Sequence, residues 1–216
     1  MRLSIIIPAR EEAAFITGTL SALQPLRAQG HEVIVVDGGS RDVTLLIARL
    51  LADRAFLAAP GRALQMNAGA REAKGGILVF LHADTRLPPD ADQLVQGSLW
   101  GRFDVRIEGR HPLLKVVAWA MNLRSRLTGI ATGDQAIFVR RDGFPGFAEL
   151  PLMEDVAFSR AMKRHSRPAC LREKVVTSGR RWESGGVMRT IVLMWRLRLL
   201  FFLGVPPDQL ARRYER

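Results

Sequence analysis

Short apolar runs alternate with segments of helical spacing over the first 81 residues, and this alternation constrains the fold more than any other feature. The apolar runs, rich in β-branched residues and each followed by a polar or glycine-containing turn, cover residues 3–7, 31–36, 55–58 and 77–81. The segments between them with helical spacing are 11–29, 41–54 and 62–74. This alternation predicts an α/β fold with a mostly parallel central sheet covered by helices.

The pattern loosens after residue 84. We predict helices over 88–99 and 154–165, an amphipathic segment over 113–127 and a helical C-terminus from residue 186. Further strands are predicted at 103–107, 135–140, 169–171 and 175–177. The 216 residues contain no linker-like or repeated stretch, which predicts a single domain over 1–216.

The net charge of +11 requires an anionic partner, either nucleic acid, a membrane surface or a phosphorylated substrate. Many arginines lie beside apolar stretches in the second half, which favours a membrane surface or a diphosphate. Segment 187–205 is too short and too often interrupted by arginine to cross a bilayer. The N-terminus lacks a signal peptide, so we expect a cytoplasmic protein, with peripheral contact at the inner membrane as an open alternative.

Polar residues directly after the predicted strands are the first candidates for a site, because ligands of open parallel sheets bind beyond the carboxyl ends of the strands. Asp37 follows one strand and can accept hydrogen bonds from a base or ribose. Gly38 and Gly39 let a ligand approach the backbone, and Ser40 can cap the next helix. Helix capping explains Ser40 as well as ligand binding does.

His82 and Asp84 follow another strand with one residue between them, which places both side chains on the same side of an extended segment. A carboxylate and an imidazole suit Mn²⁺, and an ion there neutralises a departing diphosphate. The alternative for His82 is a structural role.

Glu154 and Asp155 open a predicted helix, where they either cap it or take a proton from an acceptor hydroxyl. Arg180, Arg181 and Trp182 lie in a predicted loop, where arginine matches diphosphate oxygens and tryptophan offers a stacking face. The chain has no dinucleotide-binding glycine motif, phosphate-binding P-loop, Cys/His metal cluster or nucleophile elbow.

Seven motifs together resemble the family 2 glycosyltransferases of the GT-A fold, and more narrowly the small bacterial group of arsenosugar-biosynthesis-associated glycosyltransferases. They are SIIIPAREE (4–12), VDGGSRD (36–42), GRALQMNAGA (61–70), FLHADT (80–85), GDQAIF (133–138), PLMED (151–155) and RRWE (180–183). Their order and spacing cover the chain almost from end to end.

The resemblance implies a nucleoside-diphosphate-sugar site and a hexosyltransferase-like activity. The residues placed at that site are Pro8, Arg10, Glu12, Asp37, Arg62, Asn67, Asp84, Gly133, Asp134, Arg181 and Trp182. Residues 1–98 then form the nucleotide-sugar-binding half, and 99–216 the acceptor-binding half. His82 stands where the family's metal motif has its first acid and Asp84 where it has its last, which implies a divalent metal, Mn²⁺ or Mg²⁺.

The resemblance also implies inversion at the anomeric carbon, with Asp155 as the base beside Glu154. Ser178 stands where processive synthases have a glutamine, which argues against polysaccharide synthesis. The acceptor is an unidentified hydroxyl compound, small or lipid-linked, and we expect no nucleic acid partner. Segments 113–127 and 190–205 either present a basic, apolar surface to lipid or are ordinary core helices.

Two other classes stay open at this point. A nucleotidyltransferase of similar fold normally carries a glycine-rich basic loop after the first strand, where this chain has Pro-Ala-Arg-Glu-Glu. A non-catalytic basic protein that binds nucleotide, nucleic acid or anionic membrane explains the charge but leaves the acidic residues after the strands unexplained.

Overall fold

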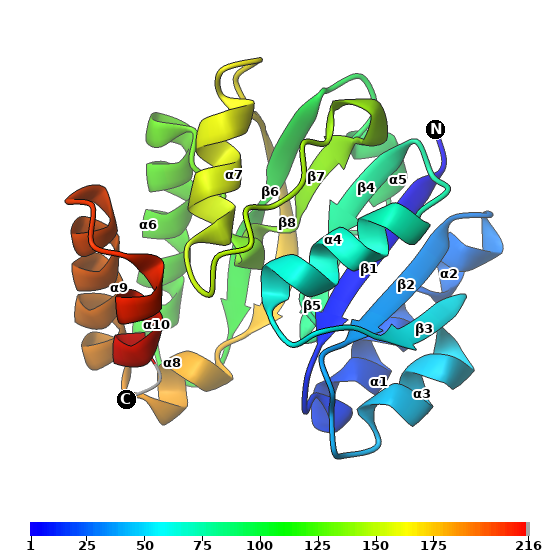
Figure 1. The fold of residues 1–216 in the computed structure, drawn as a ribbon, viewed down its shortest axis with the longest axis horizontal. Coiled ribbons are helices and arrows are strands. Elements are labelled where there is room, and N and C mark those ends of the chain that lie inside the picture. The colour runs from blue at the N-terminus through cyan, green and yellow to red at the C-terminus, as the bar shows by residue number, and fades with distance from the viewer. Residues whose placement is uncertain (215–216) are drawn as a thin grey trace.

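The structure is a computed structural model that describes residues 1–214, built around one sheet with the strand order β3-β2-β1-β4-β7-β6-β8-β5 (Figure 1). The strands are β1 (Leu3–Ala9), β2 (Glu32–Asp37), β3 (Arg54–Leu57), β4 (Ile77–Phe80), β5 (Thr85–Arg86), β6 (Trp100–Glu108), β7 (Ile137–Arg140) and β8 (Ala169–Ser178). The first four strands along the chain pair in parallel, as predicted. Strand β7 then pairs antiparallel with both β4 and β6.

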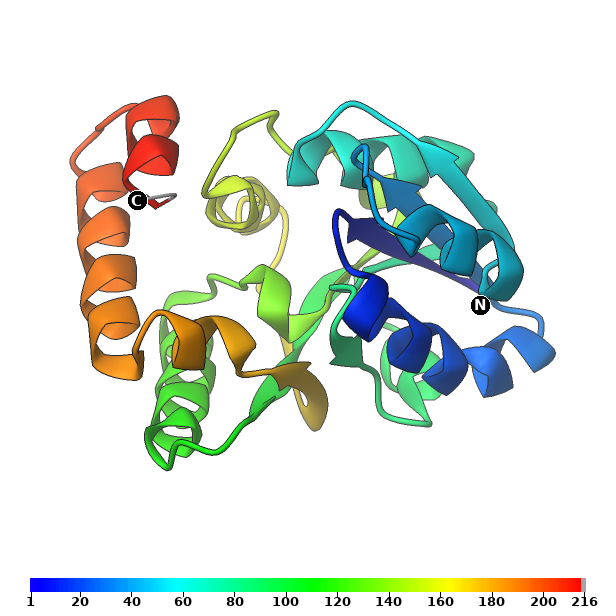
Figure 2. The ribbon, with the colours of Figure 1, turned by 90° about the horizontal axis from the view of Figure 1, so that it is seen from below.

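Helices cover both faces of the sheet. They are α1 (Ala13–Ala22), α2 (Gln24–Ala28), α3 (Thr44–Leu51), α4 (Arg62–Glu72), α5 (Ala91–Leu94), α6 (Leu113–Thr128), α7 (Glu154–Met162), α8 (Arg180–Ser184), α9 (Val187–Phe202) and α10 (Pro207–Tyr214), with 3₁₀ turns η1 (Gly133–Gln135) and η2 (Arg141–Gly143). Figure 2 shows α4 and α7 on one side of the sheet and α1 and α6 on the other. The predicted α/β fold with a helical C-terminal segment is therefore confirmed.

Strand β1 shows why the sheet is buried on both faces. Ile5 and Ile7 pack into one apolar cluster with α1 and α6, whereas Ile6 packs into the other cluster with α4 and α7. Successive side chains of a strand point to opposite faces, so a continuous apolar run fills both layers. A third cluster joins α9 and α10 to the start of α7.

Several predicted elements differ from the observed ones for local reasons. The predicted helix over 11–29 is broken into α1 and α2, because Pro25 lacks an amide hydrogen and starts a new helix. The predicted helix over 88–99 shrinks to α5, and Gly97 follows it with a φ of 80°. The two strands predicted at 169–171 and 175–177 are one strand, β8, with an irregular register opposite Phe103 and Asp104.

Within residues 1–214, no helix combines the length and the apolar character needed to cross a bilayer.

Helix α4 approaches the sheet closely at Gly69. A Cβ atom there would lie 2.5 Å from Cγ2 of Ile6 and 3.1 Å from Cγ2 of Val36. By contrast, a Cβ atom on Gly18, an exposed residue of α1, meets nothing within 4 Å.

We therefore predict opposite effects for two identical substitutions. Gly69→Ala lowers the free energy of unfolding by about 1–3 kcal/mol, because the sheet must shift to admit the methyl group. Gly18→Ala raises it by up to about 1 kcal/mol, because alanine favours the helix. Urea denaturation measures both, and an equal stabilisation at the two positions would contradict the close approach of α4.

Candidate active site

The carboxyl ends of β1, β2 and β4 form one rim, where the loops after β1 and β2 are tied together. The hydroxyl of Ser40 accepts a hydrogen bond from the Glu11 amide at 2.9 Å, and the hydroxyl of Thr44 accepts one from the Glu12 amide at 2.8 Å. Helix capping was one of the two alternatives for Ser40, but α3 begins only at Thr44 and its N-cap residue is Val43. The serine instead fixes the loop that presents Glu12.

Asp37 lies at the end of β2 and is fully buried. Its Oδ1 accepts hydrogen bonds from the amides of Gly39 at 2.8 Å and Ser40 at 2.7 Å. Its Oδ2 is buried and has no hydrogen-bond partner among residues 1–214. Because a buried carboxylate oxygen without a partner is costly, Oδ2 is suited to accept a ligand donor.

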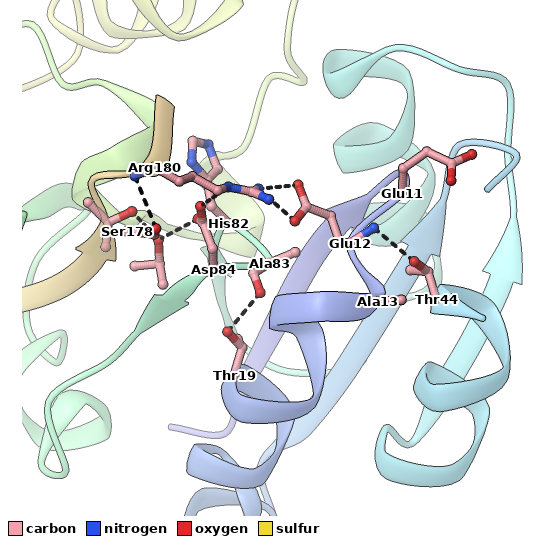
Figure 3. A network of polar contacts seen from close by, with 12 residues as sticks. Glu11, Glu12, Ala13, Thr19, Thr44, His82, Ala83, Asp84, Ser178 and Arg180 are labelled. Carbon is pink, nitrogen blue, oxygen red and sulfur yellow. Dashed lines mark hydrogen bonds and ion pairs between the residues drawn. The ribbon is translucent and has the colours of Figure 1, made fainter. Parts of the chain in front are cut away.

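Arg180 joins the two acidic residues that follow β1 and β4 (Figure 3). Its Nη2 lies 2.5 and 2.6 Å from the two carboxylate oxygens of Glu12, and its Nε lies 3.1 Å from Oδ2 of Asp84. Burial lowers the pKa of Arg180, but the hydrogen bonds and charges of Glu12 and Asp84 outweigh it and raise the pKa overall. The sequence identified both carboxylates but did not place Arg180 between them.

The predicted loop around Arg180 is wrong, because residues 180–184 form the short helix α8. The amide of Arg180 donates to the hydroxyl of Ser178 at 3.2 Å. The next residue, Arg181, stacks its guanidinium over the ring of Tyr214, 4.4 Å from the ring centroid. Trp182 is half-buried against the apolar cluster beneath α6.

His82 and Asp84 do not lie on an extended segment as predicted. The Thr85 amide donates to the His82 carbonyl at 3.1 Å, so residues 82–85 form a turn. Nδ1 of His82 lies 3.2 Å from Oδ1 of Asp134, while Asp84 pairs with Arg180. The two side chains therefore have different partners.

Gly133 packs directly against the imidazole. A Cβ atom at Gly133 would lie 2.4 Å from Nε2 of His82, so only glycine fits there. Partial burial raises the pKa of Asp134, but the hydrogen bond from His82 and the charges of Arg62 and Arg181 lower it overall. This contact holds a negative charge next to the histidine.

Glu154 and Asp155 begin α7, as predicted, and have different surroundings. Asp155 accepts a hydrogen bond from the Gly133 amide through Oδ2 at 3.1 Å. Glu154 is buried, and its Oε1 lies 3.3 Å from Nη1 of Arg62. Burial raises the pKa of Glu154, and the charge of Asp155 adds to this, although the charge of Arg62 opposes it. Two adjacent carboxyl groups thus have separate environments, which is typical of acid–base sites.

One small cavity collects several of the predicted residues. Its lining includes Pro8, Arg62, His82, Gly133, Glu154 and Asp155. Burial lowers the pKa of Arg62, but the charges of Glu154, Asp155 and Asp134 raise it overall, so its guanidinium stays charged beside these carboxylates.

Two other predicted residues lie apart from this cavity lining. Asn67 exchanges two hydrogen bonds of 2.8 Å with the backbone of Phe147, so its amide is used in positioning the loop before α7. Arg10 is exposed at the rim.

Strained backbone concentrates at the same motifs. The non-glycine residues with positive φ in the described chain are Glu11 (55°), Ala136 (46°) and Met153 (70°). Each lies next to or within a motif that the sequence marked as functional, and such conformations cost about 1–3 kcal/mol each. Packing around the rim therefore overcomes local strain to hold these loops.

The residues partly fit a divalent cation. No group of three or more His, Cys, Asp or Glu side chains within residues 1–214 is arranged to hold an ion. However, the guanidinium of Arg180 stands in for a cation between Glu12 and Asp84. Asp84 thus fits an ion whose remaining ligands come from a diphosphate. His82 does not fit, because its Nδ1 faces Asp134 and its buried Nε2 faces Gly133.

Comparisons with known proteins agree with this architecture. Residues 4–100 match the family model described as "Glycosyl transferase family 2". No protein with a curated function matches the chain in a sequence search.

The fold is that of GT-A glycosyltransferase structures. The structure of Staphylococcus aureus TarS 1-349 superposes with a TM-score of 0.64 and 22% identity, covering 83% of this chain and 61% of TarS 1-349. Glucosyl-3-phosphoglycerate synthase from Mycobacterium tuberculosis, with Mn²⁺, UDP and glucosyl-3-phosphoglycerate bound, gives 0.64 and 18%, with 95% of this chain and 81% of that chain covered. The mannosyltransferase PcManGT from Pyrobaculum calidifontis, with GDP-Man and Mn²⁺, gives 0.59 and 21%, with 81% and 56% covered. The chain thus spans about three fifths of the TarS structure.

The Arg180 bridge generates a prediction about metal binding. If the guanidinium occupies the place of a cation, Arg180→Gln tightens the binding of Mn²⁺ by the nucleotide-free protein on the order of tenfold, about 1.4 kcal/mol. Electron paramagnetic resonance of free Mn²⁺ measures this affinity.

Two further variants make that measurement specific. Arg86→Gln removes an arginine that pairs with Glu108 on the exposed surface, and should leave the affinity unchanged. Adding Asp84→Asn to Arg180→Gln should abolish the gain. Unchanged Mn²⁺ affinity in Arg180→Gln would show that the guanidinium does not occupy a cation position.

Proposed function

We propose that the protein is an inverting glycosyltransferase that moves a sugar from a nucleoside-diphosphate sugar to an acceptor hydroxyl. The observation that carries the proposal is one cavity beside the acidic rim of a GT-A sheet, lined by Asp155 and by the ion pair of Glu154 with Arg62. The match of residues 4–100 to the family 2 model supports the same activity. The narrower likeness to the arsenosugar-associated group rests on the sequence motifs alone.

The first half, residues 1–98, supplies most of the donor site in this proposal. The unpartnered Oδ2 of Asp37 and the carboxylate of Glu12 accept hydrogen bonds from the nucleoside. Arg62 and Arg181 face the diphosphate, whose oxygens guanidinium groups bind well. UDP is the first nucleotide to test, because TarS was solved with UDP-GlcNAc and with UDP.

The second half, residues 99–216, supplies the base and the acceptor site. Asp155 takes the proton of the acceptor hydroxyl, and that oxygen attacks the anomeric carbon opposite the departing diphosphate. The new glycosidic bond forms as the bond to the diphosphate oxygen breaks, and the electron pair leaves with the nucleoside diphosphate. Hydrogen bonding from the Gly133 amide keeps Asp155 oriented for this step.

A divalent cation, Mn²⁺ or Mg²⁺, belongs to the proposal as a partner of the donor. Asp84 would hold it, and it would supply neutralising charge to the diphosphate. Arg180, which pairs with both Asp84 and Glu12, would give up its contact with Asp84 to such an ion and would still offset the negative charge of Glu12.

We also propose that α6 and α9 contact an anionic membrane surface. Their exposed apolar side chains recur at helical spacing: Val116, Trp119, Leu123 and Leu127 on α6, and Met188, Val192, Trp195, Leu199 and Phe202 on α9. Trp119 is 63% exposed and Trp195 is 73% exposed. So many large apolar side chains are seldom exposed on a protein surface that contacts only water. Exposed Lys115, Arg189 and Arg196 add positive charge beside it. Tryptophan and basic side chains together suit the interface of an anionic bilayer.

The role of Asp155 is testable by substitution. Asp155→Asn should lower the rate of UDP release from a UDP-sugar about 10²- to 10⁴-fold, because the base is lost while the side chain keeps its size. UDP binding, measured by calorimetry, should change less than twofold. Asp142→Asn, at an exposed ion pair with Arg140, is the control. Full activity in Asp155→Asn would remove the residue from the mechanism.

Membrane contact is tested by flotation with vesicles containing phosphatidylglycerol at low salt. We expect the wild type to float and the Trp119→Ser/Trp195→Ser variant to lose most of that binding. Leu50→Ser is the matched control, because Leu50 is 75% exposed on α3 and lies outside the patch. Equal flotation of all three proteins, or none by the wild type, would contradict the proposal.

A further inference from the structure

Two arginines near the proposed base have buried guanidinium nitrogens without partners. Arg124 on α6 and Arg198 on α9 are both half-buried, and the two helices contact each other. Nε and Nη2 of Arg124 and Nε of Arg198 are buried and have no hydrogen-bond acceptor within residues 1–214. Neither residue belongs to the motifs that the sequence marked as functional.

Both arginines lie close enough to Asp155 and Asp134 for these two carboxylates to affect their pKa values. Burial, and after it the positive charge of Arg198, lower the pKa of Arg124 to about 10 even though the charges of Asp155 and Asp134 oppose the shift. Burial also lowers the pKa of Arg198, against the charges of the same two aspartates. The two guanidinium groups therefore repel each other at a point within electrostatic reach of Asp155.

Other arginines in contact with α6 do have acceptors for their guanidinium groups. Arg102 is fully buried, but it bonds to Ser125 and pairs with Asp104, and Arg126 pairs with the other oxygen of Asp104. Only for Arg124 and Arg198 among these do buried nitrogens remain without an acceptor in the described chain.

Burying hydrogen-bond donors without an acceptor lowers the stability of the folded protein. A buried donor without an acceptor costs about 1–3 kcal/mol, and more when it is charged. Arginine does not escape by losing its proton at neutral pH. Two close guanidinium groups with free donors are thus suited to an oxyanion, which accepts several hydrogen bonds and cancels the repulsion.

We propose that Arg124 and Arg198 bind an oxyanion group of the acceptor, so that the acceptor is a phosphate- or carboxylate-bearing compound. This inference rests on the proposed glycosyl transfer and adds the substrate class. The anionic group docks between α6 and α9, and the acceptor hydroxyl extends from it to Asp155. The outer faces of the same helices carry the apolar patch, so the oxyanion comes either from a soluble compound or from a lipid headgroup.

Inorganic phosphate is the first probe, titrated by calorimetry at low salt in the absence of nucleotide. Arg124→Met and Arg198→Met should each weaken phosphate binding at least tenfold. Arg49→Met is the matched control, because it removes the same charge from an exposed position on α3, away from α6 and α9, and should change the affinity less than twofold. Equal phosphate binding by all four proteins, or none by the wild type, would overturn the inference.

Thermal unfolding gives a second readout that does not depend on the reaction. In phosphate-free buffer, Arg198→Met should melt at a higher temperature than the wild type, because one of two repelling buried charges is gone. Phosphate should raise the Tm of the wild type and of Arg49→Met, but not that of Arg198→Met. A lower Tm for Arg198→Met that still rises with phosphate would count against the pair as an anion site.

The same variants separate this inference from the proposed transferase. UDP binding that is retained in Arg124→Met and Arg198→Met, with phosphate binding lost, supports both. UDP binding without any phosphate binding overturns the acceptor inference alone, whereas phosphate binding without binding of any nucleotide overturns the proposed transfer. Glycerol 3-phosphate and vesicles of phosphatidic acid then identify the source, since loss of one or the other in the variants assigns a soluble or a lipid oxyanion.

Discussion

The central position of β1 is the constraint on which the rest of the structure depends. It pairs in parallel with β2 on one side and β4 on the other, and its side chains fill the apolar layers on both faces. Its register sets Ala9 opposite Asp37, so the loops that follow β1 and β2 leave the sheet together. Because parallel strands end at one edge, the residues that follow them are brought to a single rim without any loop being long.

Charge compensation then decides how that rim is arranged. Carboxylates gathered at one edge repel each other unless cations lie between them, and here each cation is a guanidinium from a distant part of the chain. Arg180 spans Glu12 and Asp84, while Arg62 faces Glu154. Because these arginines face at least as many carboxylates, the net charge of +11 comes from basic residues elsewhere in the chain.

The sequence predicted the first half of the fold well because its signals are local. Apolar runs of four to six residues followed by turns specify parallel strands, and residues after those strands fall at the rim by topology alone, as Asp37 and Asp84 do. The fold after residue 84 depends on pairing between distant segments. The antiparallel pairing of β7, the two-residue β5 and the helix α8 were therefore not predicted. Arg180 contacts Glu12 across 168 positions, and no local pattern predicts such a contact. The turn at His82 was missed for a related reason, since its geometry is set by packing against Gly133.

Helices α6 and α9 carry two chemically different groups of side chains, and the two proposed roles of these helices account for both groups. Their exposed sides carry tryptophans and aliphatic residues, while Arg124 and Arg198 are half-buried and have buried guanidinium nitrogens without an acceptor in residues 1–214. A helix that served only to cover the sheet needs neither exposed tryptophan nor a buried arginine without a partner. A pair of helices that rests on a bilayer and holds an oxyanion on its inner side needs both, because the apolar side fixes the depth of the protein at the surface. In the proposed arrangement, the distance from the bilayer to Asp155 would be set by the packing of α6 and α9, the same packing that completes the fold.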